Sequence, residues 1–150
     1  MENTVLLREA QEADLSGLLA LYAQLGDNPI PQNSENLLSL WREILAYPGH
    51  HIVIAEVEGQ LAASCVLQII PNLTHGQRPY ALVENVVTDA AFRRQGLASS
   101  CLNWAQEKAR TAGCYKLMLL TGSKEEGTLH FYEKAGYNRK DKIAFIQWLE

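Results

Sequence analysis

The chain has 150 residues, of which 47% are hydrophobic and 20% are charged, and its formal net charge is −4. This length supports one packed core, so we expect a single domain over residues 1–150, and the negative charge disfavours general binding to nucleic acid or anionic membranes. No apolar run reaches the roughly 18 residues that cross a bilayer, and no leader-like segment opens the sequence, so we expect a cytoplasmic protein without membrane contact.

The first third of the chain is expected to be mostly helical after a short strand at residues 4–8. From Gln11 to Gly26, apolar side chains recur at intervals of three and four, which predicts an amphipathic helix with capping side chains from Asp14 and Ser16 near its start. The residues of this stripe are Leu15, Leu18, Leu19, Tyr22 and Leu25. Ser34 then caps a second predicted helix that ends before Pro48.

The middle of the chain is expected to form a sheet. HIVIAEVEGQLAASCVLQII, which starts at His51, predicts two strands joined by a hairpin turn at Glu58-Gly59. A third strand starts at Tyr80, and a helix with small residues on one face ends at Gly113. The continuous apolar run at residues 116–121 predicts a strand that is covered on both faces and parallel to the strand from Tyr80.

The last segment carries a short helix and an apolar ending. Leu129, Tyr132 and Ala135 predict a helix that stops at Gly136, and the alternation of Ile143, Phe145 and Trp148 predicts a last antiparallel strand. These elements indicate one mixed α/β domain. The apolar ending, residues 143–149, is also suited to a contact in a homodimer.

The stretch from Ala81 to Ala98, ALVENVVTDAAFRRQGLA, combines two features of a binding site. A helix that begins after Gly96 and is flanked by Arg93 and Arg94 offers free N–H groups and positive charge to a phosphate, although a solvated arginine pair is the simpler alternative. Glu84 lies in a strand that otherwise appears buried, which would raise its pKa and make it a candidate base, unless it pairs within the sheet or faces a polar edge.

Two motifs resemble the GCN5-related N-acetyltransferases (GNAT). Arg93-Arg94-Gln95-Gly96-Leu97-Ala98 fits the family pattern of Gln or Arg, two residues, Gly, one residue, and Gly or Ala, and Phe131 to Tyr137 resembles a later family motif. The resemblance covers Tyr80 to Tyr137. It implies the GNAT fold, a mixed, mostly antiparallel sheet of six to seven strands flanked by helices, with a central splayed parallel pair. It also implies transfer of an acetyl group from acetyl-CoA to an amine.

Within the family, three short segments are similar to glucosamine 6-phosphate N-acetyltransferases: Glu84–Val87, Gly113–Lys116 and Phe131–Lys134. The chain differs from those enzymes at residues 120–123, and it has Asn85 where they have an aspartate. The acceptor therefore stays open among sugar phosphates, amino acids, polyamines, antibiotics and protein amines.

The resemblance also implies roles for individual residues. The backbone N–H groups of the helix start would hold the pyrophosphate of acetyl-CoA, and the backbone of the strand before it, freed by a bulge, would pair with the pantetheine amides. The donor-binding residues would be Val86, Val87, Thr88, Arg93, Arg94, Gln95, Gly96, Leu97 and Ala98. Glu84, directly or through water, would take a proton from the amine, the Val86 N–H would stabilise the carbonyl oxygen, and Tyr132 would protonate the departing thiolate.

Acceptor contacts are expected from loops, where binding residues commonly lie. We expect these in residues 27–33 and 71–80, with Asn72 and Arg78 as candidates, together with Asn85 of the strand. The four histidines and three cysteines lack metal-ligand spacing, so we expect no metal and structural, reduced cysteines. Since no cysteine occurs in the predicted chemical segment, we expect direct attack in a ternary complex without a covalent enzyme intermediate.

Two other functions remain compatible with the sequence. The chain could be a CoA-binding sensor or regulatory module without efficient catalysis, or it could acetylate amines of proteins or peptides. The presence of both Glu84 and Tyr132 favours an enzyme over a sensor.

Overall fold

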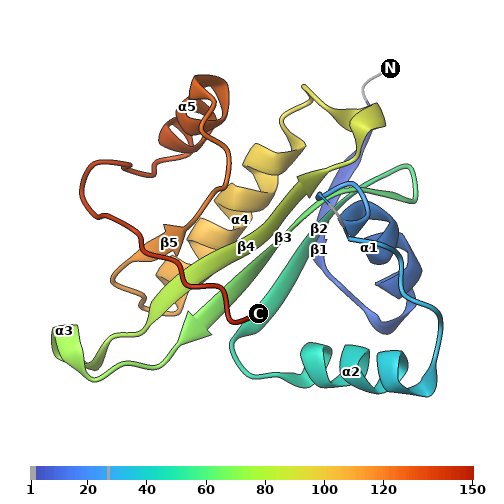
Figure 1. The fold of residues 1–150 in the computed structure, drawn as a ribbon, viewed down its shortest axis with the longest axis horizontal. Helices are drawn as coiled ribbons and strands as arrows, with labels where there is room; N and C mark the ends of the chain where they lie inside the picture. Colours follow the sequence, from blue (N-terminus) through green and yellow to red (C-terminus); the bar gives the residue numbers. More distant parts are fainter. Residues whose placement is uncertain (1–2, 27) are drawn as a thin grey trace.

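The fold is described from a computed structural model that covers residues 3–26 and 28–150. Within these residues the chain forms five strands, five helices and two short 3-10 turns (Figure 1). The strands are β1 (Val5–Glu9), β2 (His50–Val57), β3 (Gln60–Ile70), β4 (Tyr80–Thr88) and β5 (Leu117–Leu119). The helices are α1 (Leu15–Tyr22), α2 (Glu35–Ala46), α3 (Thr74–Gln77), α4 (Leu97–Thr111) and α5 (Glu126–Lys134), and the 3-10 turns are η1 (Glu12–Asp14) and η2 (Ala90–Phe92).

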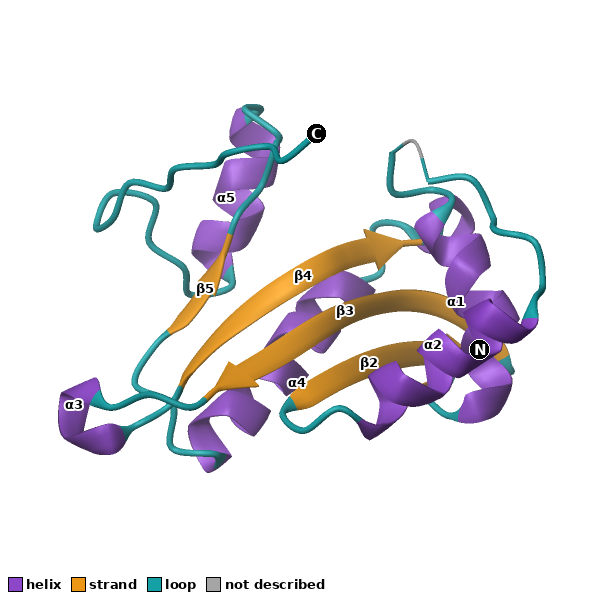
Figure 2. Cartoon of the chain, turned by 60° about the horizontal axis from the view of Figure 1, so that its bottom comes forward, coloured by secondary structure: helices purple, strands orange, loops and turns teal. Residues whose placement is uncertain are grey.

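The strands form one mixed sheet in the order β1-β2-β3-β4-β5. The pairs β1–β2, β2–β3 and β3–β4 are antiparallel, and the pair β4–β5 is parallel. Figure 2 shows α4 on one face of this sheet and α1 and α2 on the other. The predicted α/β architecture is confirmed, but the expected number of six to seven strands is wrong, and the parallel pair lies at the edge of the sheet rather than at its centre.

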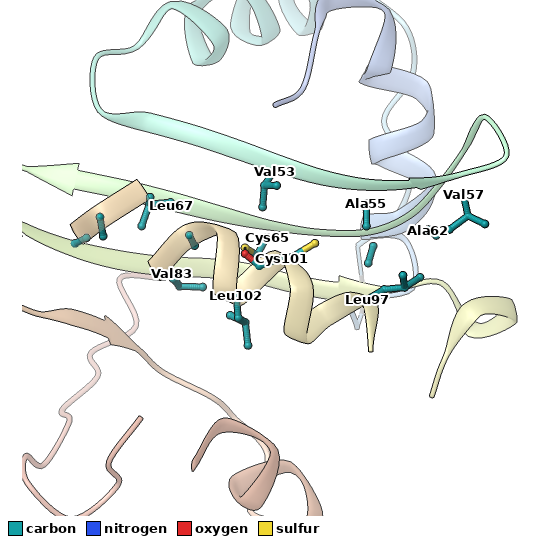
Figure 3. Packing of buried hydrophobic residues seen from close by; sticks show 14 residues of the cluster. Val53, Ala55, Val57, Ala62, Cys65, Leu67, Val83, Leu97, Cys101 and Leu102 are labelled. Carbon is teal, nitrogen blue, oxygen red and sulfur yellow. The ribbon is translucent and has the colours of Figure 1, made fainter. Parts of the chain in front are cut away.

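The face under α4 carries the larger part of the core. Cys101, Ala105 and Ala109 of α4 are buried against the sheet, and these small side chains let the helix axis lie close to the strands. Figure 3 shows Cys101 of α4 beside Cys65 of β3. Leu67 and Val83 fill this layer from β3 and β4, and each is fully or almost fully buried. Burial of one such side chain stabilises the fold by about 1.5–3 kcal/mol.

The opposite face is covered by α1 and α2, which pack Leu18, Leu21 and Trp41 against the strands. Ser34 caps α2 as predicted, because its Oγ accepts a hydrogen bond from the Leu37 N–H at 3.1 Å. The Glu58-Gly59 hairpin is also confirmed, with φ of +49° and +81° at its two residues.

Asp14 supplies capping chemistry at the start of the helical segment, as predicted, but it caps η1 rather than α1. Its side chain accepts a hydrogen bond from the Gln11 N–H at 2.7 Å, and it also accepts hydrogen bonds from Arg8 at 2.7 and 2.9 Å. Arg8 also donates to Glu56 at 2.9 Å, so one guanidinium joins β1, β2 and η1. The hydrogen bond from Arg8 holds the pKa of Asp14 below its usual value, against the opposing effect of burial.

The C-terminal residues do not form the predicted last strand. No helix or strand follows Lys134, and Ile143, Phe145 and Trp148 are 83%, 91% and 74% exposed. Because this segment does not return to the sheet, β5 is a half-buried edge strand of three residues, and the expectation of a longer strand covered on both faces is wrong. Among the described residues, no helix combines the length and apolarity needed to cross a membrane.

Candidate active site

A β-bulge at Asn85 organises the site. Val66 of β3 lies opposite Glu84 and Ser64 lies opposite Val87, so the single residue between Val66 and Ser64 faces two residues of β4. Asn85 adopts φ of +51°, a left-handed conformation that asparagine tolerates better than most residues. The bulge, which the resemblance implied, is therefore present.

The extra residue inverts the side-chain alternation along β4. Before the bulge, Val83 packs on the α4 side; after it, Val86 packs on the α4 side and Val87 on the side of α1 and α2. At the inversion, Glu84 and Asn85 are adjacent in sequence and line the same cavity. The bulge thus brings two consecutive polar side chains to one face.

The bulge also redirects the backbone groups of β4. Pairing with β5 covers only Ala81 to Val83, and the Ala81 N–H donates to the Lys116 carbonyl at 3.0 Å. Beyond the bulge, the Asp89 N–H donates toward β3, to the Ala62 carbonyl at 2.8 Å. Since backbone groups alternate along a strand, those of Val86 and Thr88 face the side that β5 has left. Those of Val87 face β3, which differs from our expectation of three successive free residues.

The start of α4 is open to solvent. Arg94 and Gly96 have φ of +63° and +75°, and Arg93 to Gly96 are exposed, whereas Leu97 is buried beneath them. The first intrahelical bond runs from the Ser100 N–H to the Gly96 carbonyl at 3.0 Å, and no side chain in the described part of the chain caps this end. The N–H groups of the first turn therefore remain available to a ligand. A Cβ on Gly96 would have no protein atom within 4 Å, so steric crowding does not require a glycine here. The positive φ favours glycine at this position instead.

Tyr132 lies on α5, half-buried, where it packs against the α4-side core and against Phe131, with ring centroids 5.0 Å apart. Burial raises the pKa of the Tyr132 phenol above its usual value of 10, and the nearby Cys65 thiol adds to this rise. The neighbouring Tyr137 ring is 6.3 Å away, and its buried hydroxyl has no hydrogen-bond partner among the described residues.

Glu84 lies on the other side of the sheet from Tyr132. It is exposed at the rim of the cavity under α1 and α2, so our expectation that burial would desolvate its carboxylate is wrong. The side chain is exposed because the bulge occurs where β4 has lost β5 as a neighbour. The free edge of β4 at Val86 and Thr88 separates the side that carries Glu84 from the side that carries Tyr132.

A cavity of about 430 Å³, which we name the α1–α2 cavity, lies between these helices and the sheet. Its polar side chains are Glu84, Asn85, Tyr22, His50 and Gln68, and its remaining lining residues are apolar. His50 Nδ1 and Gln68 Oε1 are 2.7 Å apart. Burial raises the pKa of Tyr22 to about 12, partly offset by a hydrogen bond with Asn85.

Tyr22, His50 and Gln68 were not among the site residues predicted from the sequence. The register of the hairpin pairs His50 with Gln68, so the predicted hairpin could have indicated that these two polar side chains lie next to each other on one face of the sheet. A smaller neighbouring cavity of about 220 Å³ shares Tyr22 and Asn85 and is bordered by residues 28, 29 and 31, so part of the predicted 27–33 loop reaches the site. Asp27 of that loop is outside the described residues.

Asn72 and Arg78 lie elsewhere. Arg78 donates to the carbonyls of Gly113 and Cys114 at 3.0 and 3.1 Å, and Asn72 donates to Thr74 and to the Arg78 carbonyl. Their loop, which contains α3, is at the end of β4 away from the start of α4 (Figure 1). Of the three predicted acceptor-binding residues, the structure places only Asn85 beside Glu84.

The three cysteines are free, as predicted. Cys65 faces the bulge from β3 but is fully buried, and its thiol donates to the Cys101 carbonyl at 3.6 Å. Burial raises the pKa of Cys101 to about 12 and also raises that of Cys65, so both remain protonated thiols. Among the described residues, no group of three or more His, Cys, Asp or Glu side chains is arranged to hold a metal ion.

Comparison with known proteins identifies relatives of the whole chain. The model of the acetyltransferase (GNAT) family matches residues 18–137. The glucosamine 6-phosphate N-acetyltransferase of Trypanosoma brucei brucei is 31% identical over 138 residues, which cover 91% of this chain and 90% of that protein. A solved structure of an acetyltransferase described as putative, from Agrobacterium tumefaciens, is 38% identical, with a TM-score of 0.88 over 95% of this chain and 99% of that one. An aminoglycoside N-acetyltransferase solved in complex with CoA has the same fold at 18% identity, with a TM-score of 0.80 over 99% of this chain and 97% of that one.

Proposed function

Because the chain belongs to the acetyltransferase (GNAT) family, we propose that it transfers the acetyl group of acetyl-CoA to a primary amine of a small molecule by direct attack in a ternary complex. The observation that carries this proposal is the combination of an open α4 N-terminus with the bulged, partly unpaired edge of β4. These are the two surfaces that the phosphate and amide groups of CoA require.

The donor would bind along these two surfaces. The pyrophosphate would accept hydrogen bonds from the N–H groups of Leu97, Ala98 and the preceding Gln95-Gly96 turn, with Arg93 and Arg94 contributing positive charge nearby. The pantetheine amides would pair with Val86 and Thr88, whose backbone groups face the unpaired side of β4. The CoA complex of a protein with the same fold supports this donor.

The reaction would proceed across the edge of β4. A neutral amine attacks the thioester carbon, the C–N bond forms, and the Val86 N–H stabilises the negative charge on the carbonyl oxygen. The proton lost by the amine goes to Glu84 directly or through water, which the exposed position of this carboxylate permits. The C–S bond then breaks, and Tyr132, kept protonated by its raised pKa, gives a proton to the thiolate. The buried, protonated Cys65 thiol is unsuited to form an acyl intermediate.

We also propose that the protein forms a homodimer through residues 143–149. Five large apolar side chains in this segment are between 67% and 92% exposed: Ile143, Phe145, Ile146, Trp148 and Leu149. Apolar surface of this kind is typical of a protein–protein contact. In β5, the same chain offers an edge strand that a second copy could pair with.

The test is an acceptor screen of the purified protein. Acetyl-CoA should raise its melting temperature, and at least one amine should release free thiol from acetyl-CoA at a rate that depends on the protein. Absence of acetyl-CoA binding would refute the proposal. Binding without acetylation of any small amine or peptide would support a CoA-binding sensor instead.

A further inference from the structure

We infer that the acceptor is an amine carried on an apolar aliphatic or aromatic body, rather than a phosphorylated sugar, and that this body occupies the α1–α2 cavity. The inference rests on the proposed function and narrows its substrate class. It depends on what lines the cavity, which charges are absent from it, and where its polar groups lie.

The roof of the cavity is apolar except for Tyr22 of α1. The helices contribute leucine, isoleucine and tryptophan side chains to it: Leu15, Leu18, Leu19, Leu37, Leu40, Trp41 and Ile44. A ligand body that covers this surface gains free energy in proportion to the apolar area it removes from water. Sugar hydroxyl groups placed here would lose their hydrogen bonds to water without replacement.

The floor of the cavity is formed by two rows of residues across the sheet. One row is His50, Gln68 and Leu82, and the other is Ile52, Val66 and Glu84. His50 and Gln68 interact with each other, so they do not require a ligand. Within the described residues, the Glu84 carboxylate has neither a hydrogen bond nor an ion pair, and it stands at the end of the floor beside the bulge. One anionic group beside the apolar part of the α1–α2 cavity is complementary to a ligand that has a single amine at one end of an apolar body.

A phosphate has no partner in this cavity. No lysine or arginine is among its described lining residues, and its only full charge is the negative charge of Glu84. Phosphate recognition in proteins depends on arginine, lysine or converging N–H groups, and an unpaired buried anion is costly. The volume of about 430 Å³ is within the roughly 300–1,000 Å³ of small-molecule sites. The lining of this cavity therefore does not favour a phosphorylated sugar as the acceptor.

The experiment compares matched acceptors with the intact protein and acetyl-CoA. We expect kcat/KM for 2-phenylethylamine and hexylamine to exceed that for glucosamine 6-phosphate and spermidine by at least tenfold. The opposite order, with good acetylation of the phosphorylated sugar, would overturn the inference and leave the proposed function intact. Failure to bind acetyl-CoA would instead count against the proposed function.

A variant at the cavity rim gives an independent readout. Leu40 is 51% exposed, so Leu40→Ala should fold normally while it removes apolar surface from the roof. We expect KM for 2-phenylethylamine to rise about tenfold and KM for acetyl-CoA to stay constant. Leu73→Ala, at an 85% exposed leucine outside the cavity, is the matched control and should change neither constant. An unchanged acceptor KM in Leu40→Ala would contradict the placement of the acceptor body.

Discussion

At the scale of single residues, the proposed chemistry assigns the two proton transfers to side chains on different sides of β4. Glu84 lines the α1–α2 cavity, through which the acceptor would arrive, and Tyr132 is half-buried and packs against the core on the α4 side of the sheet. The exposed group would receive a proton from the amine, whereas the half-buried group would stay protonated until it gives its proton to the thiolate. Their surroundings favour these opposite tasks.

Replacement of Glu84 tests the first task. Glu84→Gln removes the proton acceptor and keeps the size of the side chain, so it should lower kcat about 100-fold with unchanged KM for acetyl-CoA, as measured by thiol release. Glu58→Gln, at the exposed hairpin turn, is the control and should leave kcat unchanged. An unchanged kcat in Glu84→Gln would assign the proton to another route.

Replacement of Tyr132 tests the second task. Because burial raises its pKa above 10, the phenol stays protonated at neutral pH and loses its proton only in strongly alkaline solution. Tyr132→Phe should lower kcat about 100-fold with unchanged KM for acetyl-CoA. Tyr137→Phe removes a neighbouring hydroxyl that forms no hydrogen bond with any described residue, so it should keep activity and stability. Equal activity in both variants would exclude Tyr132 as the acid.

The sequence identified Glu84 as a candidate but predicted its environment wrongly. Apolar neighbours on both sides indicated a buried strand, and residue types alone do not reveal that pairing with β5 stops at Val83. Tyr22, His50 and Gln68 were missed for a related reason. Their shared cavity depends on which strands and helices become neighbours, and this is a property of tertiary structure.

At the scale of secondary structure, α4 offers two glycines with nearly the same conformation at its opposite ends. Gly96 has φ of +75° and Gly113 has φ of +83°, and a Cβ at either position would meet no atom within 4 Å. Alanine at each should therefore cost about 1 kcal/mol of stability through the backbone alone. Only Gly96→Ala should also raise KM for acetyl-CoA, by tenfold or more, because only that end would face the pyrophosphate. An equal KM in the two variants would argue against donor binding at this helix end.

The ion pairs of Arg8 join β1 to η1 and predict a pH dependence of stability. The pKa of Asp14 is lower in the folded state than in the unfolded state. Its contribution to the free energy of unfolding is therefore complete above the unfolded pKa of about 3.9 and is lost as the pH falls through the folded-state pKa. Asp14→Asn should reduce the free energy of unfolding by about 2 kcal/mol at pH 7 and by less at pH 2, measured by urea denaturation.

The matched control for this prediction is Glu12→Gln. Glu12 pairs with Arg42 at 3.0 Å, but both side chains are more than 60% exposed, so the loss should be below about 0.5 kcal/mol. A loss for Asp14→Asn that is independent of pH would show that its charge is not the stabilising feature.

Helices and turns were predictable because their signals are local. The leucine stripe of α1, the Ser34 cap of α2 and the Glu58-Gly59 turn each act within a few residues of one another. The bulge at Asn85 has no such local signal, since asparagine adopts ordinary strand conformations as well. It was expected only through the resemblance to a family.

At the scale of the whole molecule, the main difference from prediction is the C-terminal segment. Alternating apolar residues predicted a strand, and alternation is a sound signal for a strand that has a partner. In one copy of the chain these residues have no partner and remain exposed. The alternating pattern indicates that the segment can form a strand. Strand formation also needs a neighbouring strand to pair with, and the same copy of the chain does not provide one.

Removal of the segment tests the proposed dimer. The full chain should have twice the monomer mass by light scattering after size-exclusion chromatography, whereas a chain ending at Lys142 should be monomeric. Phe145→Ser with Trp148→Ser should have the same effect, and Leu73→Ser, at an exposed leucine outside the segment, should leave the dimer intact. A full-length chain that is monomeric at high concentration would refute this interface.

The inverted alternation of β4 has a consequence for how this strand tolerates change in length. The side-chain alternation before Asn85 differs from the alternation after it, and each is fixed by packing: Val83 packs beneath α4 and Val87 packs beneath α1 and α2. Deletion of one residue here would make the alternation continuous and would move every later side chain of the strand to the opposite face of the sheet. The loops of this protein should therefore tolerate insertions and deletions, whereas the number of residues from Val83 to Val87 should not be changeable without loss of packing.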